Sequence, residues 1–197
     1  MCLTGDFISH SDDVPRPADY AKVLRKVSSV PAFAVMGNHD GGHWARRARG
    51  FSDHSMMDRV LAESGIELLH NRSRVVDVRG QKLTFAGTGD LWAEEVDGEA
   101  AFRGVDALLP AVLLTHNPDT KDVLREYCWD LMLSGHTHGG QVIVPFYGPP
   151  FRSVEDTRYL SGLKPWESRQ VHVTRGVGNL HGVRFNCRPE VSLLKLA

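Results

Sequence analysis

The chain has 197 residues, of which 42% are hydrophobic and 24% charged, and its formal net charge is −1. A chain of this length and composition is expected to form a single domain over residues 1–197 and is too short for two full domains. The near-neutral charge excludes a general electrostatic attraction to nucleic acid or to an anionic membrane.

The first third of the chain alternates short apolar runs with amphipathic segments. Leu3 and Thr4 lead into a Gly5-Asp6 turn, as at the end of a buried strand. Apolar residues at positions 20, 23, 24 and 27 recur with helical spacing, so a helix is expected at 19–28. The same reasoning predicts a buried strand at 31–37, a second helix at 54–64 and a return strand at 65–71.

The rest of the chain continues this alternation, which is typical of an α/β fold. Segments 74–80 and 82–88 are expected to pair as a hairpin around Gly80. Further strands are predicted at 110–116, 130–136, 140–145, 171–176 and 190–196, and a helix at 120–127.

The cysteines and the hydropathy bear on the compartment. Cys2, Cys128 and Cys187 include no C-x-x-C pair, which argues against a disulfide framework and against a thiolate zinc site. No run approaches the roughly 18 apolar residues of a spanning helix, and no signal segment precedes the first strand. We therefore expect a cytoplasmic protein, while a longer parent with targeting signals upstream could be membrane-associated.

Four of the predicted strands end in residues that carry protons or bind metals. Because ligands gather at the carboxyl ends of strands in an open α/β sheet, these side chains are expected to meet in one crevice. They are Asp6; Asn38, His39 and Asp40; His116 and Asn117; and His136 and His138.

The residue types in this set predict a metal centre. Imidazoles combined with a carboxylate and an amide oxygen suit Mn, Fe, Zn or Co better than Mg or Ca alone. Two such ions about 3.5–4 Å apart can hold a shared hydroxide and clamp phosphate oxygens during an in-line displacement. Asp6 is the candidate bridge between the ions, and His136 and His138, one residue apart, could reach neighbouring ions.

The remaining histidines follow no such pattern. Each is interpreted as a surface residue or as a core residue with its hydrogen bonds satisfied. They are His10, His43, His54, His70, His172 and His181.

Taken in order, "TGDF", "GNHD", "THNPD" and "LSGHTHGGQVIVP" resemble the motifs of the calcineurin-like metallophosphoesterases. The last motif, followed by "VTRGVG" and "RFNCRPEV", most resembles the bacterial phosphodiesterases related to UDP-2,3-diacylglucosamine pyrophosphatases. The resemblance implies a four-layer α/β/β/α sandwich. It also implies hydrolysis of a phosphodiester or pyrophosphate bond by a hydroxide held between two metals.

The resemblance further implies the metal ligands. Asp6 would bridge the two ions, Asn38, His116 and His136 would complete one site, and His138 would belong to the other. The family's motifs begin with a D-x-H whose Asp and His bind the same ion as His138, and no D-x-H precedes "TGDF" here. We therefore expect one competent and one incomplete site, and the expected cofactors are two divalent transition metals, with binding of a single ion as the alternative.

The same absence bears on the fold. The sandwich is expected to lack its first strand, as in a truncated product of a longer protein, and the open sheet edge would favour a homo-oligomer. His10, Asp12 and Asp13 could supply substitute ligands, although a polar loop that caps the next helix is the simpler interpretation.

His39 would be the catalytic imidazole, which stabilises the transferring phosphoryl group or protonates the leaving oxygen. Two interpretations of Asp40 stay open: it orients this loop from behind, or it is an exposed turn residue. Arg46 and Arg47, close to Trp44, could grip a diphosphate or a lipid headgroup, or form an ordinary solvated helical face.

The segment "PFYGPPF" offers an apolar lip for acyl chains or a membrane, although ordinary loop anchoring explains it equally well. The expected partner is a small phosphodiester or nucleotide-lipid substrate, with peripheral membrane contact as an option and no nucleic acid. Besides the leading hydrolase hypothesis, two others stay open: a weak or inactive metal-binding interaction module, and a nuclease, which the charge does not support.

Overall fold

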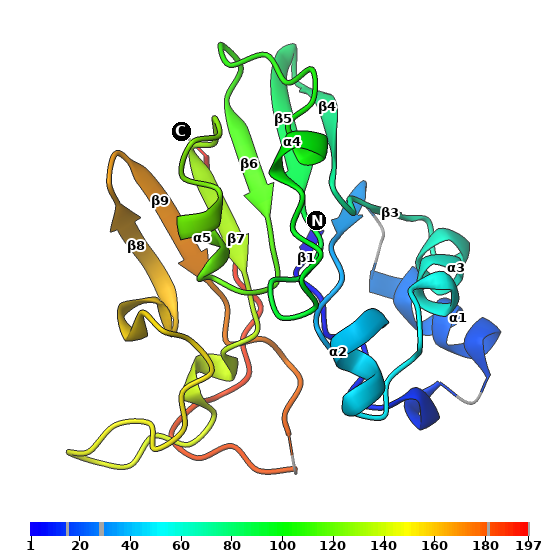
Figure 1. Ribbon diagram of the computed structural model, residues 1–197, viewed down its shortest axis with the longest axis vertical. Coiled ribbons are helices and arrows are strands. Elements are labelled where there is room, and N and C mark those ends of the chain that lie inside the picture. Colours follow the sequence, from blue (N-terminus) through cyan, green and yellow to red (C-terminus); the bar gives the residue numbers. More distant parts are fainter. Residues whose placement is uncertain (15, 28–29, 181, 197) are drawn as a thin grey trace.

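The computed structural model describes residues 1–14, 16–27, 30–180 and 182–196. Two β-sheets pack face to face, with helices on the outer side of each (Figure 1). Within the described ranges, no helix combines the length and the apolarity needed to cross a bilayer.

The smaller sheet is fully parallel, with the strand order β1-β2-β3. Its helices are crossover connections between these strands, and α1 and α3 pack on its outer face. The strands are β1 (Cys2–Leu3), β2 (Ala32–Ala34) and β3 (Ile66–Leu68). The helices are α1 (Pro17–Val27), α2 (Gly42–Arg47) and α3 (Ser55–Glu63).

The larger sheet has the order β4-β5-β6-β7-β9-β8, with four parallel central strands and an antiparallel strand at each edge. Its strands are β4 (Arg72–Val78), β5 (Gln81–Gly87), β6 (Ala111–Leu114), β7 (Leu131–Ser134), β8 (Gly162–Trp166) and β9 (Arg169–Val173). Two short helices accompany it, α4 (Gly98–Ala101) and α5 (Thr120–Val123).

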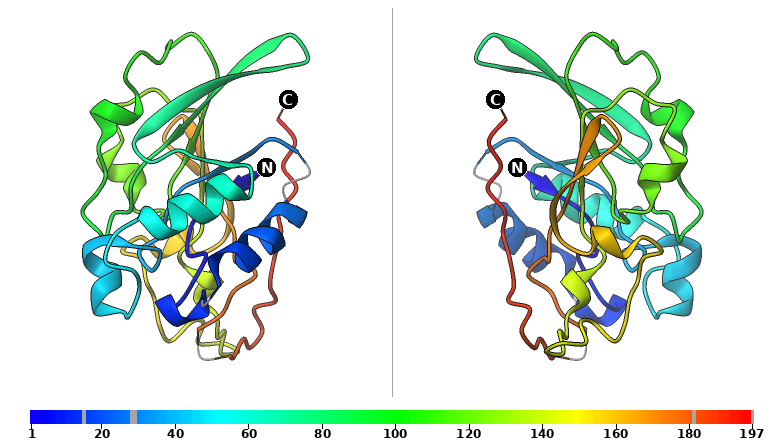
Figure 2. Two further views of the ribbon diagram at one scale, coloured as in Figure 1. Left: turned by 90° about the vertical axis from the view of Figure 1, so that its right-hand side faces the viewer. Right: turned by 90° about the vertical axis from the view of Figure 1, so that its left-hand side faces the viewer.

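Alternation along the strands builds the layers, because successive side chains point to opposite faces of a sheet. In β2, Ala34 packs with α1 and α3, whereas Phe33 faces the larger sheet and stacks on Phe85 with ring centroids 4.9 Å apart. In β6, Leu114 faces the smaller sheet and Leu113 the outer cluster around Trp129. The four-layer α/β/β/α prediction is confirmed (Figure 2).

Two predicted strands are wrong. Residues 140–145 make only isolated bridges, because Gly140 and Gln141 adopt positive φ angles of 79° and 54° that interrupt extended backbone. Residues 190–196 pair with no strand in the described part of the chain and run over the surface, as the red trace in Figure 2 shows. Leu193 in this segment is 100% exposed, so its apolar side chain does not pack against the core.

Short elements and boundaries also differ from expectation. The helix predicted at 120–127 ends at Val123, and the helix predicted at 19–28 begins at Pro17, while Ser28 lies outside the described residues. Sequence reasoning missed β8, whose Pro165 argues against a strand. Proline is tolerated there because β8 is an edge strand.

Candidate metal centre

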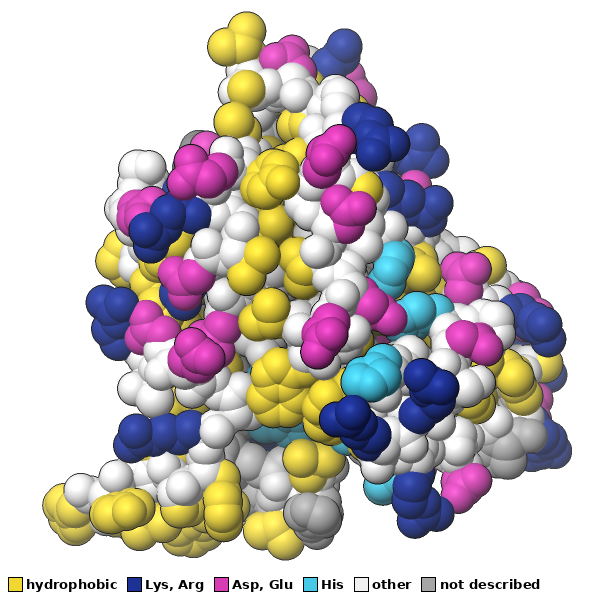
Figure 3. Space-filling model, viewed as in Figure 1, with side chains coloured by type: hydrophobic (Ala, Val, Ile, Leu, Met, Phe, Trp, Pro, Cys, Tyr) yellow, Lys and Arg dark blue, Asp and Glu magenta, His cyan; other side chains and the backbone are white. Residues whose placement is uncertain are grey.

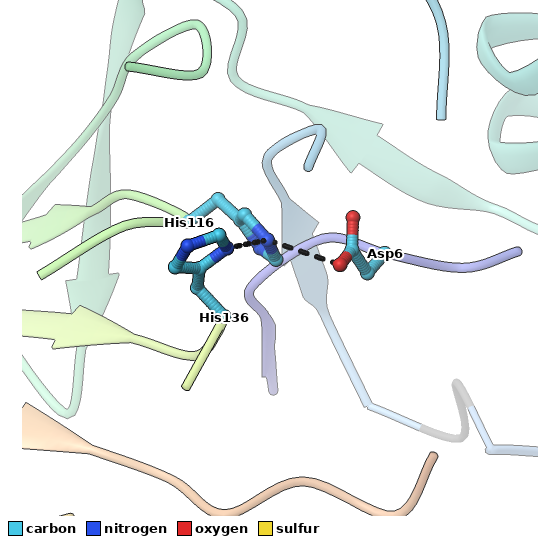
Figure 4. Close-up of side chains that lie close together, drawn as sticks. All are labelled: Asp6, His116 and His136. Carbon is cyan, nitrogen blue, oxygen red and sulfur yellow. Dashed lines mark hydrogen bonds and ion pairs between the residues drawn. The ribbon is translucent and has the colours of Figure 1, made fainter. Parts of the chain in front are cut away.

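The predicted site residues come from the carboxyl ends of strands in both sheets. Asp6 follows β1, Asn38 follows β2, His116 follows β6 and His136 follows β7. The close-up in Figure 4 shows Asp6, His116 and His136 converging from three separate loops. The sandwich therefore brings together side chains that are up to 130 positions apart in the sequence.

Three of these side chains form a compact cluster. The Nε2 atom of His116 lies 3.2 Å from the Oδ2 atom of Asp6 and 3.1 Å from the Nδ1 atom of His136. One ligand atom from each residue lies within 4.8 Å of the other two. Two ligands about 2.1 Å from a common ion and at right angles to it would be about 3 Å apart, so the spacing fits one transition-metal ion.

A fourth donor supports this fit. The side chain of Asn38 is buried, and its Oδ1 atom has no hydrogen-bond partner among the described residues. A buried carbonyl oxygen without a partner costs about 1–3 kcal/mol. A cation at this position would satisfy it, and the donor set of imidazoles, carboxylate and amide oxygen suits Mn, Fe, Zn or Co.

The surroundings orient both imidazole rings. The Nδ1 atom of His116 lies 2.6 Å from the carbonyl oxygen of Thr4, and the Nε2 atom of His136 lies 3.1 Å from that of Ser153. When these nitrogens carry the protons, His116 keeps Nε2 and His136 keeps Nδ1 as lone-pair donors. Such carbonyl contacts are the usual way in which ligand histidines are oriented.

Burial and the charge of Asp6 set the protonation of the two imidazoles. Burial disfavours a charged His116, but the Asp6 carboxylate outweighs it and raises the pKa of His116 to about 9. Burial, reinforced by His116, lowers the pKa of His136 to about 3, so this ring is neutral. An entering cation therefore has to displace one proton, that of His116.

Asp40 is fully buried and connects two loops. Its Oδ1 atom accepts backbone N–H groups of Phe7 and Ile8 at 2.7 and 3.3 Å, and its Oδ2 atom accepts those of Asp6 and Gly37, both at 2.8 Å. This geometry supports the first interpretation of Asp40, orientation of the loop, and excludes an exposed turn residue.

Three residues of the site have strained backbone conformations. Asp6, His136 and His138 have φ angles of 55°, 64° and 51°. These angles lie in the left-handed region, which residues other than glycine rarely adopt. Strain of this kind gathers at functional sites, where the surrounding structure imposes it.

His39 stands beside the cluster. Its backbone N–H donates to the Oδ1 atom of Asp6 at 3.0 Å, and its Nδ1 atom lies 3.0 Å from the carbonyl oxygen of Ser9. With Trp44 and Arg47, it lines a hollow of about 610 Å³. His39 thus lies between the metal cluster and a space that can hold a ligand.

The structure leaves His138 outside the three-residue cluster. Its Nδ1 atom bonds to Oε1 of Gln141 at 2.9 Å, and Arg184 holds its backbone by donating to its carbonyl oxygen at 3.0 Å. Arg46 and Arg47 are exposed on α2, and Figure 3 shows basic side chains gathered over that helix.

Sequence reasoning missed Asp90 and Trp92. Asp90 is buried with its Oδ2 atom unpartnered among the described residues, and burial raises its pKa against the influence of His116. Trp92 packs edge-on against His136, with ring centroids 4.3 Å apart. A signal was present, because Gly89-Asp90 follows β5 as Gly5-Asp6 follows β1.

The carboxylates in the loop after Asp6 make hydrogen bonds and an ion pair of their own. Asp13 accepts N–H groups of Ser9 and His10, both at 2.8 Å, and Asp12 pairs with exposed Arg49. Asp13 thereby caps the short turn at residues 11–13 to which it belongs. With His10, it also lines the hollow beside His39. His181 lies outside the described residues.

Comparison with known proteins decides the family. The model of the calcineurin-like phosphoesterases matches residues 1–140, which is most of the chain. The chain belongs to the calcineurin-like phosphoesterase family. Members of this family are metal-dependent and hydrolyse phosphoesters.

Relatives from bacteria refine the comparison. Phosphodiesterase YaeI of Escherichia coli is 45% identical over the whole chain, which spans 69% of that protein. The UDP-2,3-diacylglucosamine pyrophosphatase LpxG of Chlamydia trachomatis is 35% identical over 69% of the chain, but the chain spans only 43% of its length. The phosphopantetheinyl hydrolase of Mycobacterium tuberculosis shares the fold, with a TM-score of 0.50 and 11% identity over 87% of the chain and 77% of the hydrolase.

Proposed function

We propose that this protein hydrolyses a phosphodiester or pyrophosphate bond in a small-molecule substrate, with bound divalent transition metals. The observation that carries the proposal is the convergence of Asp6, His116 and His136 on one point, with the unpartnered Asn38 oxygen nearby and His39 at a hollow.

Asp6, Asn38, His116 and His136 would hold one ion, and Asp6 and His138 are the donors proposed for a second. Ions bound there would supply Lewis-acid polarisation of phosphoryl oxygens and would acidify water. The chain's own contribution is to fix Asp6 and Asn38 on two loops that share the Asp40 carboxylate, and to orient His116 and His136 through the carbonyl oxygens of Thr4 and Ser153. The ligand geometry is thereby set before substrate binds.

His39 is proposed as the catalytic residue. The Ser9 carbonyl oxygen holds its Nδ1 atom, which leaves Nε2 as the ring nitrogen for the substrate. A proton on Nε2 would be donated to the leaving oxygen or shared with a phosphoryl oxygen, both of which lower the barrier to cleavage.

The hollow beside His39 is proposed to receive the leaving group. Arg47 lines it and Arg46 is its neighbour on α2, so guanidinium groups are available to a second phosphate. One relative is named as a pyrophosphatase of a nucleotide-linked acylated sugar. This name supports a nucleotide-lipid diphosphate as the substrate class.

The test is turnover of bis(4-nitrophenyl) phosphate and of a nucleoside diphosphate sugar in Mn²⁺. His39→Asn is expected to lower kcat by about 10²–10⁴-fold while the metal content stays unchanged. His43→Asn, on the exposed face of α2, serves as the matched control and should retain the wild-type kcat; because its ring lies 3.4 Å from Arg47, kcat rather than KM is the quantity compared.

Equal turnover by His39→Asn and the wild type would contradict the role of His39. Metal binding without turnover of either substrate would favour the alternative, a metal-binding interaction module.

An aromatic loop supports peripheral membrane contact as a second part of the proposal. Phe146, Tyr147 and Phe151 are at least 74% exposed. Their segment forms the yellow loop that projects at the lower left of Figure 1, where Figure 3 shows hydrophobic side chains gathered. Exposed aromatic residues on a projecting loop are suited to a membrane interface. Sedimentation with phosphatidylglycerol vesicles should fall when Phe146 and Phe151 are replaced by Ser. Unchanged sedimentation would leave these residues as ordinary loop residues.

A further inference from the structure

A second group of metal-capable side chains lies outside the metal centre. His54 occupies the N-terminal capping position of α3, His70 follows β3, and Glu95 lies in the loop after β5. One ligand atom from each of the three residues lies within 4.8 Å of the other two. The two histidines were expected to be ordinary surface or core residues, and the fold instead places them together with a carboxylate.

The distances within this group resemble those of ligands around one ion. The Nε2 atom of His54 lies 2.9 and 2.8 Å from the two carboxylate oxygens of Glu95. The His70 ring is tilted against the His54 ring, with centroids 5.0 Å apart. Adjacent ligands about 2.0–2.2 Å from one ion would be separated by about 3 Å, so little movement is needed to admit a cation.

The hydrogen bonding of the group is incomplete. The Nδ1 atoms of both His54 and His70 are buried and have no hydrogen-bond partner among the described residues. A His–Glu ion pair accounts for His54 and Glu95, but it leaves the His70 imidazole facing them without a function. A third ligand to a shared ion is the arrangement that uses all three side chains.

The three side chains are also held in position. Asn71, next to His70, donates from Nδ2 to the Glu95 carbonyl oxygen at 2.7 Å and accepts the Gly89 N–H on Oδ1 at 2.8 Å. Gly42 lies against the opposite side, where a Cβ would come within 2.5 Å of the Glu95 Oε1 atom. Asn71 therefore fixes the backbone of Glu95, and the Gly42 backbone lies against its carboxylate and restricts its movement.

We propose that His54, His70 and Glu95 bind one divalent transition cation, preferably Zn²⁺, at a site separate from the metal centre. Two imidazoles and a carboxylate without thiolates favour Zn²⁺ and its neighbours over Mg²⁺ or Ca²⁺. His54 and His70 border a hollow of about 300 Å³, which leaves a fourth coordination position open to water or to an external ligand.

Such an ion would connect parts of the chain that matter to the metal centre. It would tie the start of α3 and the end of β3 to the loop that carries Asp90 and Trp92. Glu95 donates its backbone N–H to the Asp90 carbonyl oxygen at 3.0 Å, and Trp92 packs on His136. None of its three ligands belongs to the metal centre, so the ion would act on that centre through this loop.

The test uses the full chain in a His136→Ala background, which weakens the metal centre. Protein stripped with a chelator is dialysed against buffered Zn²⁺, and its zinc content and affinity are measured by elemental analysis and calorimetry. Adding His70→Ala is expected to remove one zinc per chain or to weaken its binding at least 100-fold. Adding His43→Ala, an exposed histidine on α2, is expected to change neither.

Glu95→Gln provides a second variant that preserves shape and can still hydrogen-bond to His54. It should also lose the zinc, and the visible absorption of Co²⁺ substituted at the site should lose intensity. Thermal unfolding in chelator shows whether each variant is folded, and if His70→Ala is not, Glu95→Gln decides. Zinc content and affinity that are unchanged in a folded His70→Ala or Glu95→Gln variant would overturn the proposal and leave an ion pair beside an unused histidine.

Discussion

Gly37→Ala tests whether the position of Asp6 sets metal affinity. A Cβ at Gly37 would clash with the Asp6 carboxylate and would lie 2.5 Å from the Asp6 backbone nitrogen and 2.8 Å from Cε1 of His116. Ordinary contact begins at 3.4 Å, so the Asp6 backbone would have to move by about 0.9 Å. The φ angle of Gly37 is not in the left-handed region, so the change adds no backbone strain.

The expected loss of affinity follows from that displacement. Metal–ligand distances tolerate about 0.2 Å, so a shift of about 0.9 Å removes Asp6 as a ligand. Mn²⁺ affinity should fall at least 100-fold, which corresponds to about 2.7 kcal/mol. Overpacking should also lower stability by about 1–3 kcal/mol, which for a chain of this size lowers the Tm by about 2–12 °C.

Calorimetric titration with Mn²⁺ and thermal unfolding in chelator measure the two effects separately. Gly178→Ala is the matched control, because a Cβ there meets nothing within 4 Å and Gly178 also lacks a left-handed φ angle. Wild-type Mn²⁺ affinity in folded Gly37→Ala would refute the assignment of Asp6 as a ligand.

Three further predictions concern metal, pH and fluorescence. Mn²⁺ at 100 times its Kd should stabilise the protein by about 2.7 kcal/mol and raise the Tm by about 5–11 °C in calorimetric scans, and His136→Ala should lose most of this rise. Burial alone would raise the pKa of Glu190, but the hydrogen bond from Arg175 outweighs it, so the pKa is lower in the folded than in the unfolded protein. The ion pair therefore stabilises the fold at a pH above the unfolded pKa, and this stabilisation is lost as the pH falls through the folded pKa. Glu190→Gln should therefore lower the unfolding free energy by up to about 1 kcal/mol at pH 7, and denaturant titrations should show this difference vanish in acid; a constant difference would argue against the pair. Co²⁺ should quench tryptophan fluorescence mainly through Trp92, which contacts His136, so Trp92→Phe should remove most of the quenching; full quenching in the variant would assign it elsewhere.

The sequence predicted those parts of the fold in which the spacing of apolar residues matches the face that the folded element buries. Strand ends carrying Asp6, Asn38, His116 and His136 lie where parallel strands had to converge, and the hairpin around Gly80 formed as expected. The strand predicted at 140–145 failed because the alternation of apolar residues does not reveal the positive φ angles of Gly140 and Gln141, which interrupt the extended backbone.

The missed residues fail for a different reason. Asp90 repeats the Gly-Asp signal of Asp6, but whether it lies near the cluster depends on how the two sheets stack. The grouping of His54 with His70 and Glu95 has no local signature, because the three residues come from separate segments. The left-handed backbone at His136 is likewise imposed by its loop, and imidazole side chains do not predict it.

The Asp40 carboxylate has a consequence for protein engineering. Because it accepts N–H groups from both the loop after β1 and the loop after β2, the two loops are matched to each other in length and path. A chimera that takes one of these loops from a relative would leave donors without an acceptor, or the carboxylate without donors. Exchange of residues 5–8 and 37–40 as one unit is the graft that keeps this network whole.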